Sequence, residues 1–199
     1  MRILLVIGLV FGLMGNAFAL ERCKQYSHDV RVQHWTYFGT SYPYHFGIGQ
    51  LQQESNCRAT VTAFDAGQGV AQFMPQTEEY CEKFLGPLNM YNPQQAIRAQ
   101  AWYMRKIHKE NWDGALWITY SFYNSGARTI KKEWLGTQCS LCHKTAFYDE
   151  MKKVCKRNVL TLKSGKTLDL CIVGYTYPIN IYTYGKQYKL LDDGIWNFW

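Results

Sequence analysis

The stretch that decides the fold runs from Gln52 to Pro75 and reads QQESNCRATVTAFDAGQGVAQFMP. It opens with one acidic residue, Glu54, which lies near the C-terminal end of a helix expected over residues 44–54. Residues 59–69 are predicted to form a loop, because their glycines allow tight backbone turns. A short helix is expected over residues 69–74, before a proline that marks a helix break or cap. The stretch therefore places one carboxylate where a helix meets a loop.

The rest of the chain has the patterning of a mainly helical protein. Asn92-Pro93 is a strong helix start, with Asn as N-cap and Pro at the first helical position, and apolar residues continue that helix to about His108. A further helix is expected from Asp113 to about Asn124. Residues 159–173 alternate with period two around a Ser-Gly turn, which predicts a β-hairpin. A Tyr-rich segment follows, and we expect it to be helical from about Pro178.

The N-terminus has the three parts of a secretory signal peptide. Arg2 gives a positive start, Ile3–Met14 is apolar, and Ala17-Phe18-Ala19 is a small-residue cleavage site. The alternative is a membrane anchor or a buried helix, but the apolar run is too short to cross the hydrocarbon core of a bilayer. We therefore expect residues 1–19 to be removed near Ala19. Residues 20–199 then form one exported domain, in the periplasm or cell envelope, with no stable membrane insertion.

The chain is basic and aromatic. Its formal net charge is +7, and it contains 15 Tyr and 7 Trp. A basic exported protein suits an anionic surface such as cell wall, phospholipid or nucleic acid, and charge alone does not choose among them. The aromatic residues serve core packing in most proteins, but flat rings also cover the apolar faces of sugars in glycan-binding clefts.

Cysteine usage indicates disulfides in an oxidising compartment, with one thiol left over because the count is odd. Cys139-Ser-Leu-Cys142-His143 also fits the attachment pattern of c-type haem. A zinc site from Cys139, Cys142, Cys155 and Cys171 is a second alternative, although a second Cys-x-x-Cys is missing. We favour disulfides and expect no metal and no cofactor. The seven cysteines are Cys23, Cys57, Cys81, Cys139, Cys142, Cys155 and Cys171.

Four blocks, taken in order, resemble the lysozyme-like lytic transglycosylase domain of the soluble-transglycosylase type, the SLT domain. They are Glu54-Ser55, Gly69–Pro75 (GVAQFMP), Phe122–Gly126 (FYNSG) and Tyr177–Tyr184 (YPINIYTY). The family has E-S, G-L-M-Q-x-M-P, A-Y-N-A-G and Y-V-x-x-V-x-x-Y at these places. The resemblance implies a mainly α, lysozyme-like α+β fold. That fold would be a single helical domain with a Cys-rich β-hairpin insertion, at about residues 133–173, before the last helix.

The sequence also departs from the family pattern. Ala63 stands where the family has a Ser that helps to hydrogen-bond the Glu or the substrate, and Ala66-Gly67 reverses the usual Gly-Ala. The Glu that commonly precedes the late Tyr helix is absent. The separation between Gly126 and Tyr177 is longer than usual, and this is why residues 133–173 are interpreted as an insertion.

The resemblance implies cleavage of the β-1,4 bond between N-acetylmuramic acid and N-acetylglucosamine in peptidoglycan. Glycoside cleavage normally uses two carboxylates, but one is enough if the N-acetyl oxygen of the muramoyl residue attacks its own anomeric carbon. Glu54 would first protonate the leaving oxygen. It would then take the proton of the muramoyl 6-hydroxyl, which closes a 1,6-anhydro ring.

The resemblance also supplies the other site residues and the alternatives. Ser55, Gln72, Tyr123, Asn124 and Tyr177 are expected to bind substrate, although Ser55 could equally be structural. The alternatives are a lysozyme-type muramidase, in which Asp65 would position water, and a non-catalytic glycan-binding module. We interpret Asp65 as a turn-forming residue. The expected partner is peptidoglycan rather than nucleic acid, in the setting of a secretion, conjugation or phage machine or of wall remodelling.

Overall fold

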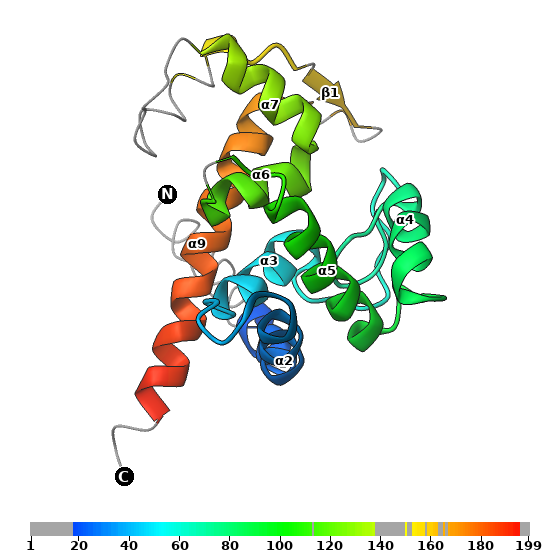
Figure 1. The fold of residues 1–199 in the computed structure, drawn as a ribbon, viewed down its shortest axis with the longest axis vertical. Coiled ribbons are helices and arrows are strands. Elements are labelled where there is room, and N and C mark those ends of the chain that lie inside the picture. Colours follow the sequence, from blue (N-terminus) through cyan, green and yellow to red (C-terminus); the bar gives the residue numbers. More distant parts are fainter. Residues whose placement is uncertain are drawn as a thin grey trace, which may run out of the picture. The chain divides into compact units, whose positions relative to one another are not determined.

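The computed structural model describes residues 18–112, 114–137, 150, 153–157, 159–162, 165 and 167–195. The described chain is mainly helical, as predicted (Figure 1). Its elements in chain order are α2 (Ser27–Phe38), α3 (His45–Ser55), α4 (Pro75–Leu85), α5 (Pro93–His108), α6 (Leu116–Ser125), α7 (Ala127–Gly136), β1 (Val159–Thr161), β2 (Thr167–Asp169) and α9 (Leu170–Ile195).

The chain forms two compact units. The first consists of residues 1–103 and 181–199, and the second of residues 104–180. Helices α5 and α9 each contribute residues to both units. The predicted cleavage near Ala19 and the single transglycosylase domain over 20–199 remain predictions. Among the described residues, no helix combines the length and the apolar character needed to cross a membrane.

Glycines allow the helices of the first unit to pack closely. A Cβ on Gly49 of α3 would lie 2.6 Å from the carbonyl oxygen of Ile181 and 2.7 Å from the amide nitrogen of Gly185, both in α9. A Cβ on Gly185 would lie 2.3 Å from Cδ1 of Phe46 in α3. Close by, the Tyr188 hydroxyl donates a hydrogen bond of 2.5 Å to Oε1 of Gln52. Helix α3, which carries Glu54, is therefore fixed against α9 by backbone-to-backbone contact.

Helix α2 packs on the same helix through a buried histidine. His34 is fully buried, and a Cβ on Gly47 of α3 would lie 2.8 Å from its Cε1. Its Nδ1 donates to the carbonyl oxygen of Val30 at 2.9 Å, and its ring stacks on Tyr42 with centroids 4.9 Å apart. Nε2 has no hydrogen-bond partner within the described part of the chain. Burial lowers the pKa of His34 to about 4, against a smaller opposing effect of the Val30 carbonyl.

Several sequence predictions need correction. Residues 69–74 do not form a helix, because Gln68 pairs with Phe73 as an isolated antiparallel bridge, and α4 begins at Pro75. The helix expected from Asp113 begins at Leu116 in α6. Helices α2, α4 and α7 were not predicted. By contrast, the expected helices over 44–54 and from Pro93 to His108 agree with α3 and α5 to within one residue.

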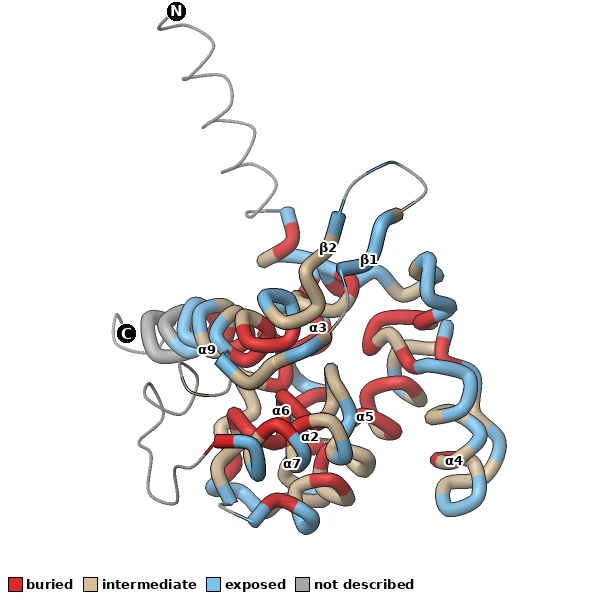
Figure 2. Tube along the Cα trace, turned by 90° about the horizontal axis from the view of Figure 1, so that it is seen from above, coloured by how far each residue is buried: buried red, intermediate tan, exposed pale blue. Residues whose placement is uncertain are grey.

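The β-hairpin is shorter than predicted. Strands β1 and β2 pair antiparallel, with Val159 opposite Asp169, and the hairpin is largely exposed (Figure 2). The chain turns into α9 at Leu170, because Oδ1 of Asp169 accepts the amide protons of Cys171 and Ile172 and so caps the first turn. The last helix therefore begins earlier than the predicted Pro178, which lies inside it.

The Gly49→Ala variant tests the crossing of α3 and α9. Because the new methyl group would meet backbone atoms that have no rotamer to change, the helices must separate, and we expect a loss of about 1–3 kcal/mol in the free energy of unfolding. Gly136→Ala is the control, since its Cβ would meet only the Val154 side chain at 3.6 Å, an ordinary contact. We expect that variant to be at least as stable as wild type. Chemical denaturation with the disulfides intact measures both, and equal stability of the two variants would contradict the close approach.

The buried imidazole predicts a pH dependence. Below pH 6.5 the unfolded chain protonates His34, whereas the folded chain resists protonation until about pH 4. The contribution to stability is therefore complete above pH 6.5 and is lost as the pH falls toward 4, at up to about 1.4 kcal/mol per pH unit. His34→Gln should flatten the pH dependence of unfolding in this window. His28→Gln, which removes an exposed imidazole of the same helix, should keep the wild-type slope.

Candidate active site

Glu54 is the second-last residue of α3, and its side chain is half-buried. The helix ends directly after Ser55, because Asn56 and Cys57 adopt left-handed backbone angles, with φ values of 51° and 59°. The Asn56 amide closes the last turn by donating to the carbonyl oxygen of Gln52 at 2.9 Å. A disulfide then joins Cys57 to Cys23. The carboxylate is thus held at a helix end that backbone geometry and a covalent link both fix.

Ser55 connects this helix end to the following loop. Its hydroxyl is buried and donates to the carbonyl oxygen of Val70 at 2.8 Å. It also accepts the Arg58 amide proton at 3.1 Å. The Ser55 hydroxyl therefore holds the loop that contains Val70 against the end of α3, one residue after Glu54. Of the two roles expected for Ser55, this arrangement favours the structural one.

Gln72 lies in the loop that Ser55 holds. It has a left-handed backbone, with φ of 51°, and its Nε2 donates to the carbonyl oxygens of Gly69 at 2.7 Å and Val61 at 3.3 Å. The loop needs glycine at position 69, where φ is 70° and a Cβ would lie 1.8 Å from the carbonyl oxygen of Met90. The side chain of Gln72 is therefore oriented by its own loop, which commits its amide N–H groups and leaves the oxygen as an acceptor.

Asp65 has the role that the sequence favoured. It is exposed, and its Oδ1 accepts the amide proton of Gly67 at 3.3 Å, two residues along the chain. That contact is typical of an aspartate that stabilises a turn.

The other expected site residues belong to the second unit. Tyr123 and Asn124 lie in the last turn of α6, which ends at Gly126, where φ is 79°. Tyr123 is half-buried and Asn124 is exposed. Tyr177 is buried in the first half of α9. Oδ1 of Asn124 accepts a hydrogen bond of 3.0 Å from the Ser125 hydroxyl, which occupies the oxygen of an exposed side chain.

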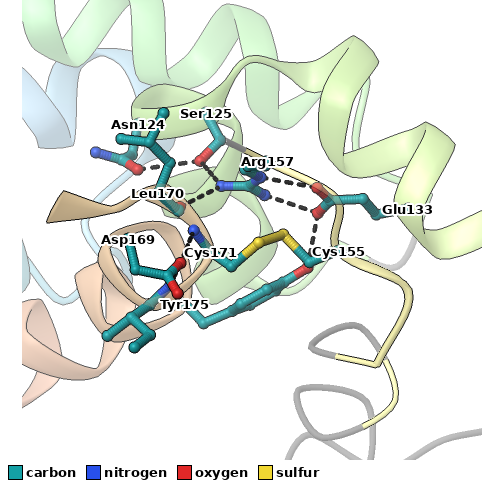
Figure 3. Close-up of a disulfide and its surroundings, with 10 residues drawn as sticks. Asn124, Ser125, Glu133, Cys155, Arg157, Asp169, Leu170, Cys171 and Tyr175 are labelled. Carbon is teal, nitrogen blue, oxygen red and sulfur yellow. Dashed lines mark hydrogen bonds and ion pairs between the residues drawn. A yellow bond between two sulfur atoms is a disulfide. The ribbon is translucent and has the colours of Figure 1, made fainter. Parts of the chain in front are cut away.

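A network of charged and polar side chains holds Ser125, the hydrogen-bond partner of Asn124 (Figure 3). Arg157 donates to the Ser125 hydroxyl at 2.7 Å through one nitrogen and makes a bidentate pair with Glu133 at 2.7 Å through the other two. Tyr175 donates to the same carboxylate at 2.6 Å. Burial raises the pKa of the Tyr175 phenol, and its hydrogen bond to Glu133 adds to the effect, so the phenol stays a donor. Gly174 leaves room for the guanidinium, because a Cβ there would lie 2.0 Å from it.

Sequence reasoning missed this network. One signal was present, since Glu133 follows Ile130 by one helical turn and both are buried on α7. A glutamate on the buried face of an amphipathic helix implies a partner cation. Its partner lies 24 residues further on, beyond the part of the insertion that the structure does not describe, and no local pattern identifies it.

Four of the five cysteines that the structure describes form disulfides. Cys155 pairs with Cys171 next to Arg157. This disulfide uses two of the four cysteines that the alternative zinc site would need. Cys81 is a buried free thiol, and burial together with the negative charge of Glu78 raises its pKa to about 12. Cys139, Cys142 and His143 lie outside the described residues.

Comparison with known proteins places this chain. Residues 48–141, which include Glu54, Gln72 and Asn124, match the sequence profile of the transglycosylase SLT domain. The chain resembles the transglycosylase SLT domain over this segment. No curated protein sequence matches it.

Two solved structures share the fold of this chain. One is the 70 kDa soluble lytic transglycosylase of Escherichia coli, at 17% identity and a TM-score of 0.62, over 80% of this chain and 24% of that one. The other is an inactive mutant of the lytic transglycosylase Slt from Pseudomonas aeruginosa, at 17% identity and a TM-score of 0.58, over 82% and 24%. This chain thus spans about a quarter of either protein. The mainly helical, lysozyme-like fold expected from the sequence is confirmed.

Glu133→Gln tests the network. It keeps the shape of the side chain but leaves the Arg157 guanidinium, 12% exposed, without a countercharge. Removing one member of a buried pair costs about 3–5 kcal/mol of unfolding free energy. Glu110→Gln is the control, because the ion pairs of Glu110 with Lys106 and Lys131 are exposed and should cost less than about 1 kcal/mol. Chemical denaturation measures the free energy of unfolding of both variants. Similar losses would show that the buried pair contributes no more to stability than the exposed pairs.

Proposed function

We propose that this protein is a peptidoglycan lytic transglycosylase that cleaves the bond between N-acetylmuramic acid and N-acetylglucosamine with formation of a 1,6-anhydro product. The observation that carries the proposal is the match of residues 48–141 to the SLT domain, with Glu54 inside the match at a fixed helix end. The two structural relatives, both lytic transglycosylases by description, add support at the level of the fold.

Glu54 is the general acid and then the general base. As an acid it protonates the glycosidic oxygen, so that N-acetylglucosamine leaves as a neutral alcohol. The N-acetyl oxygen of the muramoyl residue bonds to the anomeric carbon from the opposite face and takes over the electron deficit. The carboxylate then accepts the proton of the 6-hydroxyl while that oxygen displaces the acetamido oxygen. Glu54 gives up one proton and takes one back, so a single carboxylate is enough and no water is consumed.

The remaining site residues bind and orient glycan. Gln72 offers an acceptor, because its own loop takes up its amide N–H groups. Asn124 offers N–H donors, because Ser125 occupies its oxygen. An acetamido group carries one donor and one acceptor, so Gln72 in the first unit and Asn124 in the second each suit one half of such a group. The half-buried Tyr123 contributes aromatic surface, the buried Tyr177 helps to orient the sugar, and Ser55 fixes the helix end beside Glu54.

The protein acts outside the cytoplasm in this proposal. Its two described disulfides, Cys23–Cys57 and Cys155–Cys171, are compatible with an oxidising compartment. The signal-peptide pattern of residues 1–19 would direct the chain to the periplasm or cell envelope, where peptidoglycan lies.

Glu54→Gln decides the mechanism. It keeps the side-chain shape but cannot give or take a proton, so release of soluble muropeptides from purified sacculi should fall by about 10²–10⁴-fold or more while glycan binding persists. Asp65→Asn is the matched control. It alters a turn carboxylate, and turnover should stay within about tenfold of wild type, because ring closure needs no activated water.

End-group analysis of the wild-type digest completes the experiment. We expect 1,6-anhydro ends. Reducing muramic acid ends, together with loss of activity in folded Asp65→Asn, would identify a lysozyme-type hydrolase. Binding without release of any fragment by wild type would identify a non-catalytic module.

A further inference from the structure

The second unit contains a basic pocket that the proposed chemistry does not use. It has a volume of about 700 Å³ and lies between α7 and the segment 153–157. Five cationic side chains and one carboxylate contribute to its lining: Arg128, Lys132, Lys153, Lys156, Arg157 and Glu133. The volume falls within the range of small-molecule binding sites, which is about 300–1,000 Å³.

Most of the charge in this pocket is not compensated by the residues that the structure describes. The carboxylate of Glu133 is neutralised by Arg157, and Lys153 pairs with Glu150. Arg128, Lys132 and Lys156 make no ion pair with any carboxylate of the described residues. A concave surface with three unpaired cations focuses positive potential, which favours an anionic ligand.

Helix stability does not account for these cations. Arg128 and Lys132 are four residues apart on α7, where like charges repel. Arg128 also lies in the first turn of α7, where the helix dipole disfavours a cation. On the same helix, Lys131 instead has a carboxylate partner, with its Nζ 3.9 Å from Oε2 of Glu110. The pocket side of α7 therefore keeps a repulsive arrangement that an anion would relieve.

The wall of the pocket is rigid before any ligand binds. Arg157 is fixed by Glu133, Ser125 and the carbonyl oxygen of Leu170, and the Cys155–Cys171 disulfide anchors its segment to the start of α9. Binding would not need to order this wall, although it would order the side chains of Arg128, Lys132 and Lys156.

We propose that this pocket binds the carboxylates of the peptide stems that peptidoglycan carries on its muramoyl residues. The inference rests on the proposed function, since that function supplies a substrate with a short anionic peptide at every second sugar. Arg128, Lys132 and Lys156 contact the stem carboxylates. The pocket therefore selects glycan strands that keep their stems, independently of the acid–base chemistry of Glu54.

The first test measures binding without turnover. The Glu54→Gln chain is titrated calorimetrically with the stem tetrapeptide L-Ala-D-Glu-meso-diaminopimelate-D-Ala and with the same peptide after amidation of its carboxylates. We expect binding of the free acid only. Adding Lys132→Glu or Lys156→Glu should weaken it about tenfold, or about 1.4 kcal/mol. Lys109→Glu makes the same charge change at an exposed residue outside the pocket and should stay within about twofold.

The second test compares strands with and without stems. The active chain should release fragments faster from stem-bearing strands than from strands stripped by an amidase, and Lys132→Glu or Lys156→Glu should lose that preference while cleaving stripped strands at the wild-type rate. Cleavage of both strands at equal rates by wild type overturns the inference alone. Cleavage of neither overturns the proposed function, and the calorimetry then still decides whether the pocket binds stems.

Competing ligands complete the design. Inorganic phosphate and vesicles of phosphatidylglycerol are titrated under the same conditions. Tighter binding of either, abolished by Lys132→Glu, would show that the pocket serves phosphate or a membrane surface instead and would overturn the assignment to stems.

Discussion

Helices α3 and α9 meet backbone to backbone at Gly49 and Gly185, and the geometry of the first unit depends on this contact. The contact fixes the helix that carries Glu54, and the hydrogen bond from Tyr188 to Gln52 locks its register two residues before the carboxylate. Glycine weakens a helix taken alone. Here that weakness is offset by an approach that no other residue permits.

The end of α3 shows how the chain around Glu54 is held with little freedom. Two left-handed residues stop the helix after Ser55, the Ser55 hydroxyl binds the following loop, and the Cys23–Cys57 disulfide fixes the chain immediately beyond. Each device uses main-chain atoms or covalent bonds rather than a second acidic side chain. In the proposed mechanism the Glu54 carboxylate both gives and takes a proton, and this arrangement would favour both steps because misplacement would slow each of them.

The second unit uses a buried ion pair in a comparable way. Glu133, Arg157 and Tyr175 satisfy one another, and the chain of contacts ends at Asn124 through Ser125. Such a pair is weak evidence for stability, since desolvation opposes the attraction. Its effect is on geometry. It holds Ser125, whose hydroxyl binds the exposed Asn124 side chain, and Arg157 and Glu133 also line the basic pocket on α7. One arginine thus links the proposed glycan-binding residue, through Ser125, to the pocket proposed to bind anions.

The sequence by itself determined the helical class, helices α3 and α5, the turn at Asp65 and four blocks that resemble the SLT domain. These features depend on residues that are close in the chain, so periodicity, caps and turn chemistry suffice. Tertiary structure alone decided the rest. Residues 69–74 form a turn rather than a helix, because Gln68 pairs with Phe73 and Gly69 closely approaches the carbonyl oxygen of Met90. Helix α9 begins at Leu170 because Asp169 caps it. The glycine contact of α3, the Tyr188–Gln52 bond across 136 residues and the Glu133–Arg157 pair join segments far apart in sequence. No local pattern encodes which distant partner a glycine, a tyrosine or a buried charge will meet, because packing selects that partner only once the chain has folded.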